Sequence, residues 1–353
     1  MSSYNLQSDY SFAGGIPEPP FKIDKSVSER IDPEYASFFE KHLIQNSNLL
    51  YTHRTPLEVT RKGGNVIPGQ TPLALDVSSY DIKISRKHTL GEEIPARVFV
   101  PASLENSDNR PLFVWYHGGG HVLGNISTEN SYCTKVASYS NCVVMTVDYR
   151  LAPENPFPAA VHDAFEALMF AYEKPEVLKI DNSRISVGGS SAGGNLAAIV
   201  SHKFSNFGSE LPPICLQLLV VPVIDNTATV ETQPSWRENE FTPQLPAEKM
   251  LWYRELYLPN SQDHDNPEAS PLFYSDESFK KNPPCLIAAA ACDVLRSEAE
   301  AYNVKLKKNG VNSDIIIYPG VPHPVMVMDL VLTKGKQLVQ DTTRAIKEAL
   351  YHT

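Results

Sequence analysis

The sequence predicts an α/β fold in which a mostly parallel, doubly wound central sheet carries a helical cap. Two observations indicate it: short apolar runs alternate with helical segments along the later part of the chain, and two other segments carry helix signals outside that alternation. With 353 residues and 42% hydrophobic content, the chain can bury a large core, either as one domain with insertions or as two domains.

Eight apolar runs predict the strands. The two earliest runs are short and closely spaced, which allows an antiparallel lead-in at one edge of the sheet. The later runs alternate with helices, as parallel strands joined by crossover helices do. The predicted strands are Tyr80–Ile84, Ala96–Val100, Leu112–Tyr116, Val143–Val147, Ile185–Val187, Leu216–Val221, Cys285–Ala291 and Asp314–Tyr318.

The N-terminal segment, residues 1–76, carries helix signals without strands. Asp32 before Pro33 is typical of a helix start, because an aspartate accepts from free amides and proline fits the first helical position. Thr55-Pro56-Leu57-Glu58 has the pattern of a capping box. We therefore expect a helical segment that does not join the sheet.

Residues 226–265 form the second segment outside the alternation. They follow a strand and contain a predicted helix over Pro246–Tyr257. Its apolar residues recur at helical spacing, which favours burial: Met250, Leu251, Tyr253 and Leu256. Such a helix can pack only on the other segment or on the top of the sheet. We expect the two segments to cap a core formed by residues 77–225 and 266–353.

A serine in G-x-S-x-G spacing is the most informative feature of the chain. The run Gly189-Ser190-Ser191-Ala192-Gly193 lies between a strand that ends near Val187 and a helix that includes Leu196. This is the context of a nucleophile elbow, where the serine takes an unfavourable backbone conformation and its neighbours must lack side chains. Ser191 is the candidate nucleophile, and a plain glycine-rich turn is the alternative.

A second glycine run, His117-Gly118-Gly119-Gly120, directly follows the strand Leu112–Tyr116. Acyl transfer needs preorganised N–H groups at such a strand end, because they stabilise the anion that forms on the attacked carbonyl oxygen. Gly118, Gly119 and Gly120 are therefore candidate oxyanion donors, and the amide of Ala192 is a further one. Taken alone, the run also fits a plain loop or an anion-binding nest.

A serine hydroxyl requires a histidine base held by a carboxylate, and the predicted elbow favours the chain order serine, acid, histidine. His323 lies in the loop Tyr318-Pro319-Gly320-Val321-Pro322-His323 after the last predicted strand, and Asp293 ends the strand before it. These two residues are the candidate base and acid.

Other histidines and acids fit less well. The remaining histidines after Ser191 fall in the elbow helix, in the predicted cap and at the terminus: His202, His264 and His352. Glu298 lies in the helix after Asp293, where we expect a solvated face. Asp163 and Asp225 belong to or precede other elements.

Composition excludes several function classes. The net charge is −10 and no basic cluster is present, which disfavours nucleic-acid binding. Residues 1–15 lack the apolar run of a secretory signal, and the longest apolar stretches are interrupted by Pro222 or Asp293, so we expect no membrane span.

Cysteine usage favours a reduced, cytoplasmic setting. The five cysteines include no C-x-x-C pair, and no histidine cluster has metal-ligand spacing, so we expect no metal. Cys292, beside Asp293, is interpreted as a buried thiol rather than a nucleophile.

The motifs HGGG, GSSAGG, DVL with Asp293, and GVP before His323 occur in this order. With these motifs in this order, the chain resembles the hormone-sensitive-lipase-like branch of α/β-hydrolase carboxylesterases. Further matching segments extend the resemblance from about residue 80 to the C-terminus: Asp148-Tyr149-Arg150-Leu151-Ala152-Pro153-Glu154, Pro158-Ala159-Ala160 with Asp163, and Ala269-Ser270-Pro271-Leu272.

The resemblance implies an α/β-hydrolase fold with a helical cap and no cofactor. It implies a triad of Ser191, Asp293 and His323, and it favours three of the candidate oxyanion donors: Gly119, Gly120 and Ala192. Arg150 and Glu154 match a segment that is structural in this family.

Three positions depart from the family pattern. His121 stands where an aromatic residue usually follows HGGG, and it is either a polar substrate contact or, as we favour, a packed side chain. Ser190 stands where Asp is common, which leaves the triad intact and makes Ser190 a second candidate pocket residue. Pro324 replaces the glycine that often follows the histidine, which indicates a stiffer loop.

These observations predict a serine carboxylesterase that hydrolyses short- to medium-chain esters through an acyl-enzyme. Its partner is then a small-molecule ester, and a homodimer is left open. The same scaffold could process one specialised metabolite by ester or lactone hydrolysis, deacetylation or elimination. A ligand receptor without hydrolysis is a remote alternative, because all three triad positions are filled.

Overall fold

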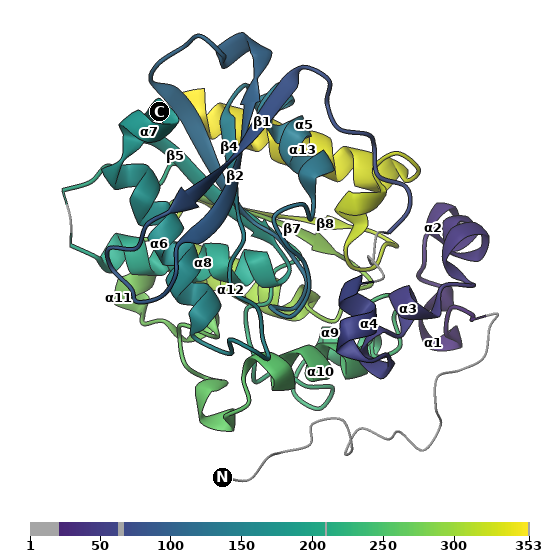
Figure 1. Ribbon diagram of the computed structural model, residues 1–353. Coiled ribbons are helices and arrows are strands. Elements are labelled where there is room, and N and C mark those ends of the chain that lie inside the picture. Colours follow the sequence, from purple (N-terminus) through teal and green to yellow (C-terminus); the bar gives the residue numbers. More distant parts are fainter. Residues whose placement is uncertain (1–20, 63–66, 209, 352–353) are drawn as a thin grey trace.

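The computed structural model describes residues 21–62, 67–208 and 210–351 and has a single mixed sheet at its centre (Figure 1). The sheet has eight strands in the order β1-β2-β4-β3-β5-β6-β7-β8. The strands are β1 Val77–Ile84, β2 Ile94–Pro101, β3 Arg110–Tyr116, β4 Val143–Val147, β5 Ile180–Ser190, β6 Gln217–Val220, β7 Cys285–Ala290 and β8 Ser313–Tyr318.

All eight predicted strands are present, and the predicted antiparallel lead-in is confirmed. β1 pairs antiparallel with β2, β2 pairs antiparallel with β4, and the other neighbouring strands are parallel. β5 is longer than predicted and runs to Ser190. Its first part contains Asp181, Asn182 and Ser183, polar residues that hid this part of the strand from a search for apolar runs.

Helices cover both faces of the sheet, as a doubly wound fold requires. α5 (Asn130–Ser140) and α13 (Thr333–Tyr351) lie on one face, and α6 (Ala159–Glu173), α8 (Ala192–Asn206) and α12 (Arg296–Lys308) lie on the other (Figure 1). Side chains of β3 alternate between the faces: Val114 packs in one core cluster and Trp115 in the other. Both faces are buried, which is why β3 reads as a continuous apolar run.

Shorter helices complete the fold. The remaining α-helices are α1 Lys25–Ser28, α2 Pro33–Phe38, α3 Ser47–Leu50, α4 Leu57–Lys62, α7 Pro175–Leu178, α9 Pro234–Glu238, α10 Ala247–Tyr257 and α11 Asp276–Phe279. A π-helical turn spans Phe39–Leu43, and short 3-10 turns span Thr52–Arg54, Ala102–Leu104, Ser261–Asp263, Pro271–Phe273 and Val325–Met328.

Two of the predicted helix starts can be compared with the structure. Asp32 caps α2 by accepting from the Glu34 amide at 2.8 Å, with Pro33 at the first helical position, as predicted. The helix predicted from the capping box begins at Leu57, and the Pro56 carbonyl accepts from the amides of Val59 and Thr60.

α10 confirms the predicted helix but not all of its predicted core. Met250 and Tyr253 are buried, whereas Leu251 is 36% exposed, so the expectation of burial is wrong for that residue. The reason is helical geometry: consecutive residues are about 100° apart, and the helix turns Lys249 and Met250 inward, which places Leu251 toward solvent.

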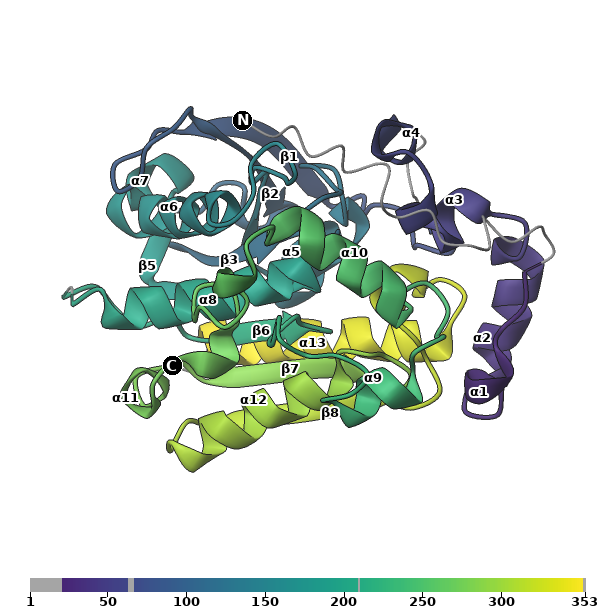
Figure 2. The same cartoon turned by 90° about the horizontal axis from the view of Figure 1, so that it is seen from below.

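The two segments outside the sheet contact each other. Arg54 binds Glu248 through two hydrogen bonds of 3.0 and 2.8 Å, and Gln244 Nε2 donates to the Tyr35 hydroxyl at 2.8 Å. In Figure 1, α3 and α4 overlap the region of α9 and α10, and Figure 2 shows α1 to α4 together at one side of the molecule. The boundaries predicted for the cap, 1–76 and 226–265, remain a prediction.

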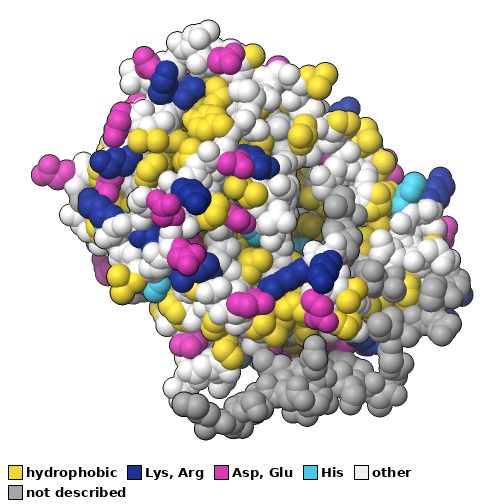
Figure 3. Space-filling model, viewed as in Figure 1, with side chains coloured by type: hydrophobic (Ala, Val, Ile, Leu, Met, Phe, Trp, Pro, Cys, Tyr) yellow, Lys and Arg dark blue, Asp and Glu magenta, His cyan; other side chains and the backbone are white. Residues whose placement is uncertain are grey.

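Charged side chains are mixed on the molecular surface. Lys and Arg side chains alternate with Asp and Glu side chains on the face shown in Figure 3. Among the described residues, no helix has the length and apolar character needed to cross a membrane. Residues 1–15, which lack the apolar run of a secretory signal, lie outside the described ranges.

Candidate active site

Ser191 occupies the turn between β5 and α8, and its backbone is strained as the elbow pattern predicts. Its φ and ψ angles are 54° and −115°; a non-glycine residue in such a region costs about 1–3 kcal/mol. The flanking glycines are sterically required. A Cβ at Gly189 would overlap the Gly193 carbonyl, and a Cβ at Gly193 would overlap the carbonyl of Tyr116 at the end of β3.

The glycine run after β3 lies beside this turn. Gly119 and Gly120 have φ angles of 123° and 63°, which favour glycine. A Cβ at Gly119 would overlap the Leu123 carbonyl oxygen, and a Cβ at Gly120 would overlap the ring of Tyr253 from α10. In the described part of the chain, the amides of Gly119, Gly120 and Ala192 have no hydrogen-bond acceptor. These amides are therefore available to a ligand oxygen.

His323 and Asp293 are paired, although 30 residues separate them in sequence. His323 Nδ1 donates to Asp293 Oδ2 at 2.8 Å, and the other carboxylate oxygen accepts from the Leu295 amide at 3.1 Å. Both side chains are buried, with exposures of 6% and 1%. The pairing fixes the imidazole so that Nε2 is the nitrogen left for another partner.

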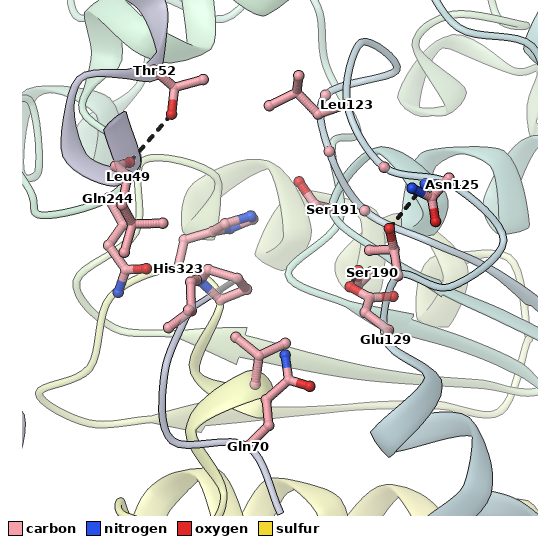
Figure 4. Close-up of a pocket in the computed structure, with 18 of the residues that line it drawn as sticks. Leu49, Thr52, Gln70, Leu123, Asn125, Glu129, Ser190, Ser191, Gln244 and His323 are labelled. Carbon is pink, nitrogen blue, oxygen red and sulfur yellow. Dashed lines mark hydrogen bonds between the residues drawn. The ribbon is translucent and has the colours of Figure 1, made fainter. Parts of the chain in front are cut away.

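One cavity of about 710 Å³ brings these elements together. Ser191, His323 and the three glycines 118–120 line it, and so do residues from both segments outside the sheet. Figure 4 shows Leu49, Thr52 and Gln244 on one side, with Ser191, Asn125, Ser190 and Glu129 on the other. The predicted nucleophile, base and oxyanion donors thus face a common space.

Glu129, which sequence reasoning missed, is a buried carboxylate in this cavity. Its Oε1 accepts from Ser190 Oγ at 2.5 Å, and its Oε2 accepts from Trp115 Nε1 at 2.9 Å. Burial raises the pKa of Glu129, while the hydrogen bonds from Ser190 and Trp115 oppose that rise. A Cβ at Gly118 would lie 2.7 Å from Ser190 Oγ and 3.3 Å from Glu129 Oε1. The carboxylate therefore lies where the elbow and the glycine loop meet.

His121 is packed, which agrees with the alternative favoured from sequence. Its ring stacks on Tyr257 with 3.7 Å between centroids and 5° between planes, and the residue is 3% exposed. Burial lowers the pKa of His121 to about 3, so the ring is neutral at physiological pH. His121 does not line the cavity, whereas Ser190 does.

The other acids considered from sequence are engaged elsewhere. Glu298 is fully buried, and its Oε2 accepts from the amides of Ile224 at 2.9 Å and Asp225 at 2.5 Å. The expectation of a solvated face for Glu298 is therefore wrong: the first turn of α12 faces the loop that follows β6. Asp163 binds Arg86 at 2.6 Å and Arg150 at 2.7 Å, which gives it a structural role.

Two histidines considered from sequence also have other partners. His202 is buried against Ser278 and Asn282, and His264 contacts the Leu258 carbonyl. His352 lies outside the described residues. Of the histidines considered, His323 is the one that lines the cavity with Ser191.

A signal for Glu129 was present in the sequence. Ser190 replaces the acid that is common before the nucleophile, and this replacement could have prompted a search for a carboxylate elsewhere. Lys249, which also lines the cavity, gave no such signal, because a lysine beside Glu248 in a helix is typical of a solvated face.

Comparisons with known proteins agree with this fold. A family model described as an alpha/beta hydrolase fold matches residues 113–327. The chain is 53% identical over 328 residues to the AB hydrolase superfamily protein C1039.03 of Schizosaccharomyces pombe, covering 93% of this chain and 96% of that one. It is 32% identical over 260 residues to the carboxylesterase NlhH of Mycobacterium tuberculosis, covering 73% and 79%. A solved Pyrobaculum calidifontis esterase matches with a TM-score of 0.78 and 31% identity, covering 90% and 98%.

Proposed function

We propose that this chain, which belongs to the hormone-sensitive-lipase-like family of α/β hydrolases, is a serine carboxylesterase that acts through an acyl-enzyme. One observation carries the proposal: strained Ser191, Asp293-bound His323 and the unoccupied amides of the glycine loop border one cavity. The carboxylesterase and esterase names of the relatives support the same reaction class.

Acylation follows from this arrangement. His323 Nε2 takes the proton of Ser191 Oγ while Oγ bonds to the ester carbonyl carbon. The negative charge that forms on the carbonyl oxygen is stabilised by the amides of Gly119, Gly120 and Ala192, and the N-terminal end of α8 also favours it. His323 then gives its proton to the leaving alcohol as the carbon–oxygen bond breaks.

Deacylation uses the same groups. A water molecule gives a proton to His323 Nε2 and bonds to the acyl carbon. The bond to Ser191 Oγ then breaks, the serine regains its proton from His323, and the free acid leaves. Asp293 stabilises the imidazolium in both half-reactions and keeps the imidazole in the required tautomer.

The cavity supports a preference for short to medium acyl chains. Its volume of about 710 Å³ is typical of a small-molecule site. Leu49, Leu123, Leu245 and Val327 provide apolar surface for an acyl chain. A triglyceride with three long chains would exceed this space, so we expect turnover of nitrophenyl butyrate to be much higher than that of long-chain triglyceride emulsions.

Replacement of Ser191 tests the function. Ser191→Ala should lower kcat for nitrophenyl butyrate by about a millionfold. Ser201→Ala is a matched control, because Ser201 is a buried serine of α8, the helix that begins directly after Ser191, and its hydroxyl donates to the Ala197 carbonyl at 2.8 Å. A phosphonate ester should add its mass to Ser191 in the wild type. Normal activity of Ser191→Ala would overturn the proposal.

A further inference from the structure

Lys249 is a buried cation in the wall of the cavity. It lies on α10 and is 6% exposed, and it lines the same cavity as Ser191 and His323. Its Nζ donates to the backbone carbonyl of Leu49 at 3.1 Å. Leu49 also lines the cavity, so both residues of this hydrogen bond border the substrate space.

The charge of Lys249 is not neutralised by the protein. An ammonium group has three donors, and no carboxylate of the described residues lies within ion-pair distance of Lys249. Glu248 is adjacent in sequence, but the helix turns it toward Arg54, which it binds at 2.8 Å. Burial alone lowers the pKa of Lys249 to about 7.

The other charged side chains of the cavity wall have partners. Arg61 binds Glu154 at 2.7 Å and the carbonyls of Val122 and Ala152. His323 is bound by Asp293, and Glu129 is bound by Ser190 and Trp115, as described above. Elsewhere in the fold, the buried Lys135 forms an ion pair with Asp329 at 2.5 Å. Lys249 therefore differs from these groups in having no counter-charge.

Two other polar groups of the cavity wall have unused hydrogen-bonding capacity. Thr60 Oγ1 and Gln244 Oε1 are buried without a partner in the described part of the chain, and both residues line the cavity. A buried, unpaired cation and an unpaired hydroxyl are costly in the free protein. An anionic group of a ligand would offset the cost of the buried cation by pairing with Lys249, and the Thr60 hydroxyl offers a further hydrogen bond to a ligand in the same cavity.

We propose that Lys249 makes the enzyme selective for esters that carry a carboxylate away from the scissile ester group. This inference rests on the proposed function and specifies its substrate class: half-esters of dicarboxylic acids, or acyl esters of hydroxy acids. The carboxylate pairs with the Lys249 ammonium at the wall formed by α10 and the N-terminal segment, while the ester carbonyl lies at Ser191.

Matched substrates test the proposal. Monomethyl glutarate has a free carboxylate on the acyl side, and 3-acetoxypropanoate has one on the alcohol side; dimethyl glutarate and propyl acetate are their uncharged counterparts. We expect the wild type to prefer at least one charged substrate over its counterpart by about tenfold or more in kcat/KM. The two pairs distinguish whether the carboxylate belongs to the acyl or the alcohol part.

Lys249→Met keeps the length and apolar stem of the side chain and removes the charge. It should lower kcat/KM for the preferred charged ester by about 30-fold or more and change that of the neutral ester by less than about threefold. Lys249→Arg should retain part of the preference. Glutarate should inhibit the wild type competitively and inhibit Lys249→Met weakly, a readout that requires no turnover.

The outcomes separate the two proposals. A charged-to-neutral ratio that is the same in the wild type and in Lys249→Met, together with Ser191-dependent hydrolysis of neutral esters, would overturn the role of Lys249 and leave the esterase proposal standing. Glutarate inhibition that survives Lys249→Met would also count against it. Failure of the wild type to hydrolyse nitrophenyl butyrate as well as the four esters would instead overturn the proposed function.

Discussion

Ser190 donates a hydrogen bond of 2.5 Å to Glu129, and this contact places a carboxylate directly behind the residue before the nucleophile. The family resemblance described above implies an aspartate at the position of Ser190. In this chain the carboxylate is supplied from the start of α5, where Glu129 has a φ of 64°. The same carboxylate accepts from Trp115 Nε1, so it connects the elbow to the core of β3.

Glu129→Gln should lower kcat by about 10- to 100-fold with little change in KM. The amide has one acceptor oxygen, so either Ser190 or Trp115 loses its acceptor, and the glycine loop and the elbow lose their fixed alignment. Steady-state kinetics with nitrophenyl butyrate measures both parameters.

A charge-swap variant provides the control for that prediction. Ser190→Asp alone places two carboxylates in contact and should impair the enzyme, because like charges at this distance repel. The double variant Glu129→Gln with Ser190→Asp restores a single carboxylate and should recover most of the lost kcat. If the double variant is as slow as the worse single variant, the alignment role of Glu129 is wrong.

Asp293→Asn should reduce kcat by about 10⁴-fold while the protein still folds. An asparagine amide can donate to His323 Nδ1, which favours the imidazole tautomer that has a proton on Nε2 and cannot accept from Ser191. Stopped-flow assays of acylation should show the loss in the first half-reaction. The combination Asp293→Asn with His323→Ala should be about as slow as His323→Ala alone, since the two residues act as one unit; strictly additive losses would argue against the pairing.

Gly119→Ala should lower kcat/KM by about 100-fold or more, because the added Cβ overlaps the Leu123 carbonyl and displaces the amide offered to the oxyanion. Gly310→Ala is a matched control: Gly310 also has a positive φ, 83°, but no atom lies within 4 Å of its added Cβ. The control should lose about 1 kcal/mol of stability and keep its activity. Equal activity losses in both variants would show that backbone strain, and not the position of the amide, is responsible.

Glu298→Gln should make stability less dependent on pH. Burial, followed by the nearby Asp225 carboxylate, raises the pKa of Glu298 from 4.5 to about 8. The wild type therefore loses stability as pH rises from the unfolded-state pKa to about 8, because the folded state resists ionisation. The stability difference, variant minus wild type, should grow by up to about 1.4 kcal/mol per pH unit over that window.

Urea unfolding at several pH values measures this difference. Glu300→Gln is the control, because Glu300 lies on the same helix with its side chain 43% exposed. The difference in unfolding free energy between Glu300→Gln and the wild type should not change with pH. A difference for Glu298→Gln that shrinks as pH rises would contradict the assignment of a raised pKa.

The sequence predicted the features that depend on local pattern. Strand positions, the strain at Ser191 and the Asp32 cap follow from apolar runs, steric needs of the glycines and cap preferences. The pairing of Asp293 with His323 followed from chain order, because both loops leave the same end of neighbouring strands.

The remaining features depend on contacts between distant segments. The sequence pattern predicts that Glu298 lies on a solvated helix face. Only the packing of α12 against the loop after β6 shows that it is buried. Lys249 becomes notable only when α10 is placed against Leu49 from the N-terminal segment. The residue pattern of one segment does not indicate which distant segment will pack against it.

Mutations on the two sides of the cavity have different consequences. The groups that break the ester follow β3, β5, β7 and β8, whereas much of the opposite wall comes from α10 and the N-terminal segment. A point mutation in α10 can therefore alter which molecule is accepted and leave the bond-breaking groups untouched. Substitutions in α10 and the N-terminal segment thus offer a route to new substrates that does not require new catalytic loops.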